Sequence, residues 1–317
     1  MDLGSAIPKL TLLLILAAVV VVSGCTGGQQ GISYGKGVII TGFESDVGSM
    51  SVESEDDVSL MVKVQNQGEV DAENVKAQII GIDLDEWGTG FSWSDEKDFG
   101  TLKAADPVTN TEGATKTAQW DLEAPELPKG TDFTYKPRVR VFYDYYTRAS
   151  KPVTLVDVEE LKRIIQQGNS LPGQSTRSSA GPFSVEIKTG DFVKTQDYDD
   201  PFPLNIFITN DLWESGGSVI EGSSYFGGWG ENLQYPVKVS ITLPEGMSLV
   251  SSEGCSTSGE WVNLWKGKSK EITCEVRIDD PPEFRQEKLI QVELEYRYFI
   301  DATTTITVIG TGEDNWL

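Results

Sequence analysis

Apolar residues alternate with polar residues along many short segments of this chain. Clear examples are Val58, Leu60, Val62 and Val64 in one segment, and Val237, Val239, Ile241 and Leu243 in another. A period of two puts successive apolar side chains on one face of a strand, whereas a helical face needs a period of 3.6. Turn-forming sequences such as 66–68 (Asn-Gln-Gly) and 243–246 (Leu-Pro-Glu-Gly) separate the segments. We therefore predict an all-β protein of short strands, each with one buried face.

Two parts of the chain match each other at a constant spacing. The matched pairs include Tyr143 with Tyr296, Tyr145 with Tyr298, Ala149 with Ala302, and Leu155 with Val308. Further upstream, Val62, Val64 and Asn66 match Ile206, Ile208 and Asn210 at a different spacing. Strands persist while loops change length, so this drift is typical of a duplication. Each copy has roughly the length and strand pattern of an immunoglobulin-like sandwich, about 100 residues or somewhat more.

The predicted organisation is two tandem immunoglobulin-like β-sandwich domains joined by a short helix and a linker. The predicted segments are a lipoprotein-type signal peptide (1–25), a tether (26–36), the first sandwich (37–157), the helix and linker (158–181), the second sandwich (182–310) and a tail (311–317). Asp157 is placed to cap the helix, and Leu161, Ile164 and Ile165 form its apolar stripe. The stretch 169–181 is rich in Ser, Gly and Pro, which is typical of a linker.

The beginning of the chain has the pattern of an export signal. Lys9 precedes an apolar run from Leu10 to Val22, which ends in Ser23-Gly24-Cys25. The run is short for a transmembrane helix, which needs about 20 apolar residues. The Cys after Ser-Gly resembles a lipoprotein signal, in which that Cys25 receives the lipid and becomes the mature N-terminus. An uncleaved anchor or an ordinary secretory peptide is the alternative.

The chain has three cysteines. Cys25 belongs to the lipid motif, which leaves Cys255 and Cys274 as an even pair in an exported chain. Exported proteins fold in oxidising surroundings, so we predict a disulfide between these two residues.

Composition narrows the possible functions. The chain contains no histidine, which removes the commonest general base and the commonest transition-metal ligand. Catalysis by paired carboxylates stays possible, although no pair stands out, and we predict a protein that is not an enzyme and has no cofactor. The net charge of −23 argues against nucleic acid or an anionic lipid surface as the partner, because both would be repelled.

The sequence also resembles a known family of adhesion-related domains. The segment 60–68 (Leu-Met-Val-Lys-Val-Gln-Asn-Gln-Gly), followed by 72–77 (Ala-Glu-Asn-Val-Lys-Ala), resembles the CARDB-type domain. The second copy is similar to a relative in surface-layer proteins through 239–247 and 266–269, but it has Asn210-Asp211 and a long insertion where Asn-x-Gly is expected. The resemblance implies a β-sandwich at the cell surface, often archaeal, and brings no catalytic residues with it.

The loop from Asp211 to Pro236 is the main candidate for binding. Its large aromatic residues are Trp213, Tyr225, Phe226, Trp229 and Tyr235, among many glycines. We expect Trp87, Phe91 and Trp93 to be their counterparts in the first copy. Exposed rings on a loop form a platform for sugars or a hot spot for a protein partner. Alternatively, the rings fold back and cover an open end of the sandwich.

Two acidic clusters are weaker candidates for a calcium site. They are Asp197, Asp199 and Asp200, and separately Glu53, Glu55, Asp56 and Asp57. Neither has the spacing of an EF-hand loop, so we interpret both as solvated turns and predict no metal site.

Together these features predict a lipid-anchored protein of the cell surface whose domains are extracellular. The expected role is adhesion or support of the cell envelope, with an envelope protein or a surface glycan as the partner. The alternatives are a carbohydrate-binding module that uses the aromatic loops, and a structural component of a surface array.

Overall fold

The computed structural model describes residues 35–88, 96–106, 108–195, 201–220, 233–250 and 253–311. The described residues all fall within one compact unit of the chain. The predicted all-β class is confirmed, since nearly every element in these ranges is a strand. In the same ranges no helix has the length and apolarity that crossing a membrane requires. Cys25 and the predicted signal peptide lie outside the described residues.

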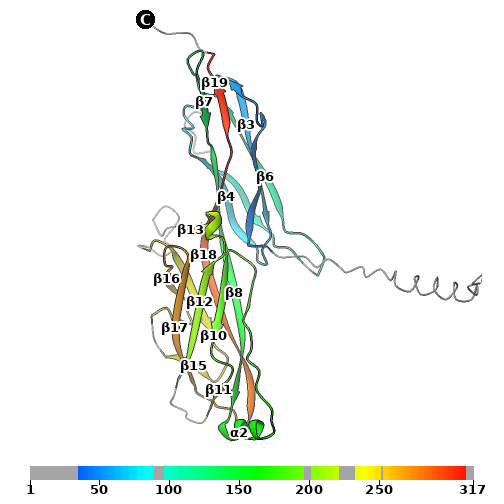
Figure 1. The fold of residues 1–317 in the computed structure, drawn as a ribbon, viewed down its shortest axis with the longest axis vertical. Helices are drawn as coiled ribbons and strands as arrows, with labels where there is room; N and C mark the ends of the chain where they lie inside the picture. Colours follow the sequence, from blue (N-terminus) through cyan, green and yellow to red (C-terminus); the bar gives the residue numbers. More distant parts are fainter. Residues whose placement is uncertain are drawn as a thin grey trace, which may run out of the picture. The chain divides into compact units, whose positions relative to one another are not determined.

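The strands follow one another as Figure 1 shows. Those of the first copy are β1 (Val38–Ser45), β2 (Val52–Glu53), β3 (Asp57–Asn66), β4 (Ala72–Ile80), β5 (Lys97–Leu102), β6 (Thr115–Glu123), β7 (Asp132–Tyr135) and β8 (Arg138–Val156). The α-helix α2 (Val158–Gln166), β9 (Arg177–Ser178), β10 (Phe183–Lys188), β11 (Val193–Lys194), β12 (Phe202–Asn210), the 3-10 helix η2 (Trp213–Ser215) and β13 (Ser218–Val219) come next. The chain continues with β14 (Pro236–Thr242), β15 (Met247–Val250), β16 (Glu260–Asn263), β17 (Ser269–Ile278), β18 (Arg285–Thr303) and β19 (Ile306–Ile309).

The strands form a central sheet and three smaller sheets. The central sheet has the order β16-β14-β18-β8-β4-β5, and β9, β11 and β13 pair with it at the sides. We call the sheet β1-β3-β6, together with the β4 and β5 side of the central sheet, the first lobe. The second lobe is the sheet β10-β12-β17-β15 with the β14 and β16 side. A small sheet, β2-β19-β7, completes the first lobe.

Strands β8 and β18 are each 19 residues long and pair antiparallel along their whole length. Figure 1 shows them side by side through both lobes. The beginning of β8 therefore belongs to the first lobe, and its end, which pairs with β9 and β11, belongs to the second. Strand β18 runs in the opposite direction, so its end returns to the first lobe.

The sheets do not close within the segments predicted as separate domains. Strand β19, which ends the predicted second sandwich (182–310), pairs with β7 and β2 of the predicted first sandwich (37–157). The second copy thus gives β19 to the first lobe, and the first copy gives the end of β8 to the second lobe. Alternation of apolar residues specifies a buried face but not the neighbouring strand, so the sequence did not reveal this exchange.

The residues that match at a constant spacing are related by an approximate two-fold axis. Tyr143 pairs with Tyr298, and Tyr145 pairs with Tyr296, so duplicated tyrosines lie crosswise around one approximate two-fold axis. Outward from β8 and β18, the order β4 then β5 on one side repeats as β14 then β16 on the other. Two short parallel pairings, β2 with β19 and β11 with β8, also correspond.

The tyrosines form the centre of the buried core. All four are essentially inaccessible to solvent, and their rings meet edge to face or tilted. Burial raises the pKa of Tyr143, Tyr145, Tyr296 and Tyr298 well above the ordinary value, because the ionised phenolate would lose its hydration. The sequence prediction that Tyr143 and Tyr145 pack in the core agrees with this arrangement.

An ion pair lies on the opposite face of the same two strands. The Arg297 guanidinium donates to both carboxylate oxygens of Asp144, at 2.5 and 2.9 Å, and Asn74 donates to the same carboxylate at 2.8 Å. The side chains are only 16% and 6% exposed, so this pair is largely desolvated. Asp144 and Arg297 are also duplicated positions facing each other across the two-fold axis.

The predicted helix is present between the copies. Asp157 caps α2 by accepting from the backbone N–H groups of Glu159 and Glu160, at 2.8 and 3.3 Å. Leu161 packs on Val156 and Leu171, whereas Ile165 is 61% exposed. The predicted linker is partly ordered, because β9 lies within 169–181 and pairs with β8.

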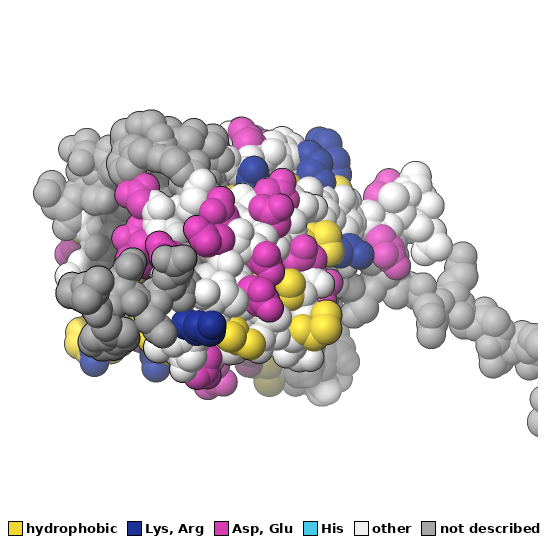
Figure 2. All heavy atoms as spheres, turned by 90° about the horizontal axis from the view of Figure 1, so that it is seen from above, with side chains coloured by type: hydrophobic (Ala, Val, Ile, Leu, Met, Phe, Trp, Pro, Cys, Tyr) yellow, Lys and Arg dark blue, Asp and Glu magenta, His cyan; other side chains and the backbone are white. Residues whose placement is uncertain are grey.

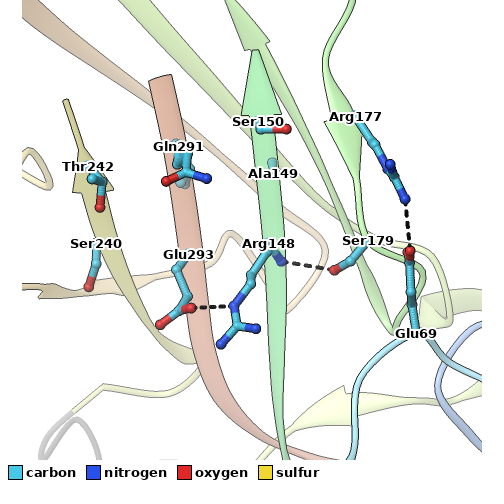
Figure 3. A pocket seen from close by; sticks show the side chains of 11 residues that line it. Glu69, Arg148, Ala149, Ser150, Arg177, Ser179, Ser240, Thr242, Gln291 and Glu293 are labelled. Atoms are coloured by element: carbon cyan, nitrogen blue, oxygen red, sulfur yellow. Dashed lines mark hydrogen bonds and ion pairs between the residues drawn. The ribbon is translucent and has the colours of Figure 1, made fainter. Parts of the chain in front are cut away.

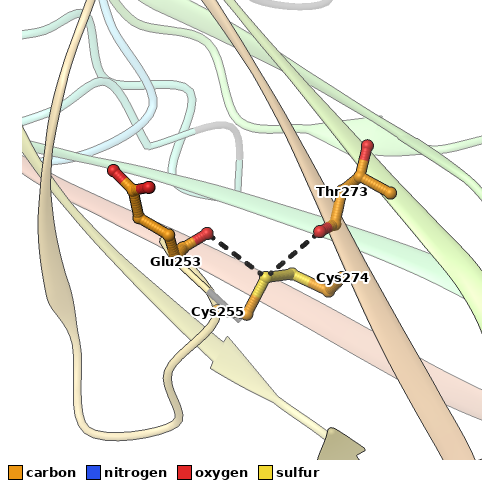
Figure 4. The surroundings of a disulfide bond; sticks show 4 residues. All are labelled: Glu253, Cys255, Thr273 and Cys274. Carbon is orange, nitrogen blue, oxygen red and sulfur yellow. Dashed lines mark hydrogen bonds between the residues drawn. A yellow bond between two sulfur atoms is a disulfide. The ribbon is translucent and has the colours of Figure 1, made fainter. Parts of the chain in front are cut away.

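The predicted disulfide joins Cys255 to Cys274, whose Cα atoms are 5.7 Å apart (Figure 4). Cys274 is fully buried in β17, and the Sγ of Cys255 lies 3.6 Å from the carbonyl oxygen of Thr273. The bond therefore ties the connection after β15 to the sheet of the second lobe. The first copy has no cysteine in the corresponding region, because Cys25 is the remaining one.

Candidate functional site

Two of the five aromatic residues predicted for binding are described by the structure. Trp213 and Tyr235 stand near the two ends of the predicted loop and are both half-buried. Tyr225, Phe226 and Trp229 lie outside the described residues. The site is therefore built here from the ends of the loop and the strands that hold them.

A buried asparagine holds the beginning of the loop. Asn210 ends β12 and is 5% exposed; its Oδ1 accepts from the Leu212 N–H at 3.0 Å and from the Tyr298 hydroxyl at 2.6 Å. Its Nδ2 donates to the carbonyl oxygens of Gly217 and Gly267, at 3.1 and 3.0 Å. A side chain that satisfies this many buried groups fixes the backbone that leads to Trp213.

Both described rings contact the turn that joins β16 to β17. A Cβ atom placed on Gly267 would lie 3.0 Å from Cζ3 of Trp213 and 3.0 Å from Cδ1 of Tyr235. Tyr235 is anchored to β16, because its N–H donates to Oδ1 of Asn263 at 2.7 Å and its carbonyl accepts from Leu264 at 3.0 Å. The ends of the loop thus converge on one β-turn.

The same turn carries an aromatic residue that the sequence analysis missed. Trp265 is 70% exposed, and the Nζ of Lys266 lies 5.4 Å from the centroid of its ring. The Nζ of Lys268 lies 5.1 Å from the ring of Trp213, within reach of a cation–π contact. The available signal was the glycine of Lys266-Gly267 between two strand-forming segments, which predicts a turn with Trp265 at its edge.

The predicted counterpart in the first copy is wrong. Trp87 is fully buried, and its ring packs edge to face on Tyr135 with centroids 5.1 Å apart. It follows β4, whereas Trp213 follows β12, which corresponds to β3. The true counterpart of the aromatic loop is the short connection 67–71, which has no aromatic residue. Phe91 and Trp93 lie outside the described residues.

A polar groove of about 410 Å³ opens on the solvent face of the central sheet (Figure 3). Its charged groups are already paired: Arg148 with Glu293 at 2.7 Å, and Arg177 with Glu69 at 3.1 Å. Figure 3 shows these pairs side by side across β18, β8 and β9, and Ser179 accepts from the Arg148 N–H at 2.9 Å. Paired, exposed charges of this kind provide neither an activated nucleophile nor a poised base.

Acidic residues dominate the surface without forming a metal centre in the described ranges. Figure 2 shows Asp and Glu side chains spread over one face, with few Lys or Arg among them. In that part of the chain, no group of three or more Cys, Asp or Glu is arranged to hold a metal ion. Asp197, Asp199 and Asp200 lie outside it.

No protein-family model and no curated protein sequence matches this chain. Among solved structures, a mutant of Salmonella alpha-2-macroglobulin aligns with 88% of this chain at 10% identity and a TM-score of 0.21, and the chain spans 23% of it. The collagen binding domain of the Erysipelothrix rhusiopathiae surface protein RspB aligns over 86% of this chain and 91% of its own, at 10% identity and a TM-score of 0.13. Both scores are too low to support an argument, so the architecture rests on the observed strand pairing.

Proposed function

We propose that this chain is a non-enzymatic binding protein of the cell surface, held to the membrane by a lipid on Cys25. Its β-sheets act as a rigid scaffold, and its partner is an envelope protein or a surface glycan. The observation that carries the proposal is the convergence of Trp213, Tyr235 and the exposed Trp265 on one turn of the second lobe. Exposed aromatic residues on a rigid scaffold are typical of a recognition surface.

The absence of catalytic chemistry in the groove supports a binding role. Histidine is missing from the whole sequence, and the two arginines that line the groove are neutralised by Glu293 and Glu69. A scaffold that joins its lobes through two long strands also favours holding a partner over moving around a substrate.

Capture of envelope components by the full chain in detergent tests the binding role. We expect Trp229→Ala, within the predicted loop 211–236, to reduce capture at least tenfold while the melting temperature changes little. The matched control is Phe133→Ala, which removes a 56% exposed ring from β7 in the first lobe and leaves capture unchanged. Loss of stability with capture retained per folded molecule would contradict the proposal.

The anchor is tested separately by fractionating cells. Cys25→Ser is expected to leave the protein unprocessed or to release it into the aqueous fraction, because the lipid acceptor is gone. A mature N-terminus other than Cys25 in the wild-type protein would rule out lipidation at this site.

A further inference from the structure

The turn between β16 and β17 has a fixed backbone. Lys266 and Gly267 have φ angles of 50° and 71°, and the Lys268 N–H donates to the Trp265 carbonyl at 2.9 Å. The Trp265 N–H in turn donates to the Ser269 carbonyl at 2.8 Å. Positive φ at both central positions is the geometry of a type I′ turn. Trp265 and Lys268 are therefore presented on a short turn that connects strands of two different sheets.

Hydrogen bonds from a buried residue also hold this turn in place. The backbone N–H of Asn210 donates to the Lys268 carbonyl at 2.7 Å, and its Nδ2 donates to the Gly267 carbonyl at 3.0 Å. Asn210 is buried, so these bonds are shielded from water. Because the protein backbone of this turn is already held in place, binding a ligand there costs little further conformational entropy, which favours affinity.

The charge of the tip differs from that of the protein. Lys266 and Lys268 are both exposed beside aromatic rings, whereas the chain as a whole carries a net charge of −23. The general field repels anions, so the ammonium groups of Lys266 and Lys268 make this turn locally more favourable for an anion than the rest of the acidic surface.

We propose that Trp265, Lys266 and Lys268 bind a sugar polymer that carries carboxylate or sulfate groups. This inference rests on the proposed surface-binding function and specifies its ligand. The exposed indole offers a flat face for the apolar side of a sugar ring, and the ammonium groups pair with its anionic substituents. A protein hot spot would instead sit in a desolvated pocket, whereas the Trp265 side chain is 70% exposed on a turn.

The test measures binding of the full chain in detergent to immobilised polysaccharides. Polygalacturonate carries carboxylates, dextran sulfate carries sulfates, and pullulan is the uncharged comparison. We expect binding to one or both charged polymers, weaker binding to pullulan, and weakening as salt rises because exposed ion pairs are screened. Comparing the two charged polymers identifies the preferred anionic group.

Substitutions in the turn test whether polymer binding depends on it. Trp265→Ala and the double variant Lys266→Gln/Lys268→Gln are each expected to weaken polymer binding about tenfold, which the handful of exposed contacts can supply. The double variant keeps every ring, so it stays informative if Trp265→Ala disturbs folding. Phe284→Ala and Lys162→Gln, at exposed positions near α2, are the matched controls and should leave binding unchanged.

Three results would overturn the inference: no binding of either charged polymer, equal binding of pullulan, or full binding by both Trp265→Ala and the lysine double variant. Equal binding of poly-glutamate or of anionic lipid vesicles would also overturn it, since the partner would then not be a sugar. Envelope capture that survives in the lysine double variant but is lost in Trp229→Ala would refute this ligand assignment while leaving the proposed function standing.

Discussion

The two copies share a buried frame but differ in the connection that follows it. Asn66 ends β3 and donates to the carbonyl oxygens of Val70 and Leu102, both at 2.9 Å, just as Asn210 donates to Gly217 and Gly267. In the first copy a short polar connection, 67–71, leads directly to β4. In the second copy the chain from 211 to 235 carries the aromatic residues.

This comparison shows where the fold tolerates change. The buried asparagine satisfies the polar groups at the beginning of either connection, so the core has the same hydrogen bonds whatever follows. Lengthening a surface loop adds little entropy cost, about 0.6 kcal/mol for each doubling. A longer connection in the second copy is therefore compatible with the shared core and with the strands exchanged between the lobes. The predictions below test the equivalence of the lobes, from the largest effect to the smallest.

The largest effect is expected from separating the copies. Fragments 37–157 and 182–310 should each fail to unfold cooperatively, because β8 and β19 lack their partner strands. In the full chain, a protease site inserted between Asn169 and Ser170 should be cut without dissociation of the halves. Circular dichroism and size-exclusion chromatography measure both results. Two fragments with independent cooperative transitions would show that the lobes are self-sufficient domains.

High pH should destabilise both lobes through the shared tyrosines. Their pKa values are raised in the folded state, so unfolded tyrosines lose protons above about pH 10 while folded ones keep them. Stability is therefore unaffected at neutral pH and is lost as pH rises, by about 1.4 kcal/mol per tyrosine at pH 11. Urea denaturation between about pH 7 and 11 measures this slope.

A single substitution measures how much of this pH dependence of stability one tyrosine contributes. Tyr143→Phe should reduce the pH dependence by about a quarter, because one of four equivalent tyrosines no longer titrates. An unchanged slope would mean that other groups, such as lysines, dominate alkaline unfolding.

Breaking the ion pair at the two-fold axis should cost about 3–5 kcal/mol. Asp144→Ala removes the carboxylate from a pair whose side chains are only 16% and 6% exposed, so Arg297 loses a largely desolvated contact. The control is Glu293→Gln, which breaks an exposed pair with Arg148 and should cost less than about 1 kcal/mol. Equal losses in the two variants would show that burial at the axis adds nothing to this interaction.

The smallest expected effect is confined to the second lobe. The double variant Cys255→Ser/Cys274→Ser should lose about 3 kcal/mol, since the disulfide no longer limits the unfolded chain. Reduction of the wild-type protein should give the same loss. Peptide mapping that finds two free thiols in protein taken from its own compartment would contradict the structure.

Local structure and the repeat could be predicted from the order of the residues alone. Alternation fixed the buried faces of strands such as β3 and β14, and Asp157 with Leu161 identified α2. An even pair of cysteines, in a chain expected to be exported, was enough to predict the disulfide. Each of these features depends on a few neighbouring residues or on a simple count, and such signals survive without any knowledge of the fold.

Which strands pair and which rings are exposed could be seen only in the folded protein. The match between Tyr143 and Tyr296 is equally consistent with two closed sandwiches and with one shared sheet, because periodicity does not name a partner. Trp87 and Trp265 are the same amino acid, yet Trp87 is buried against Tyr135 and Trp265 is 70% exposed. Exposure depends on contacts between residues far apart in the chain. That is why the sequence pointed to the aromatic loop 211–236, whereas the exposed Trp265 was found only in the structure.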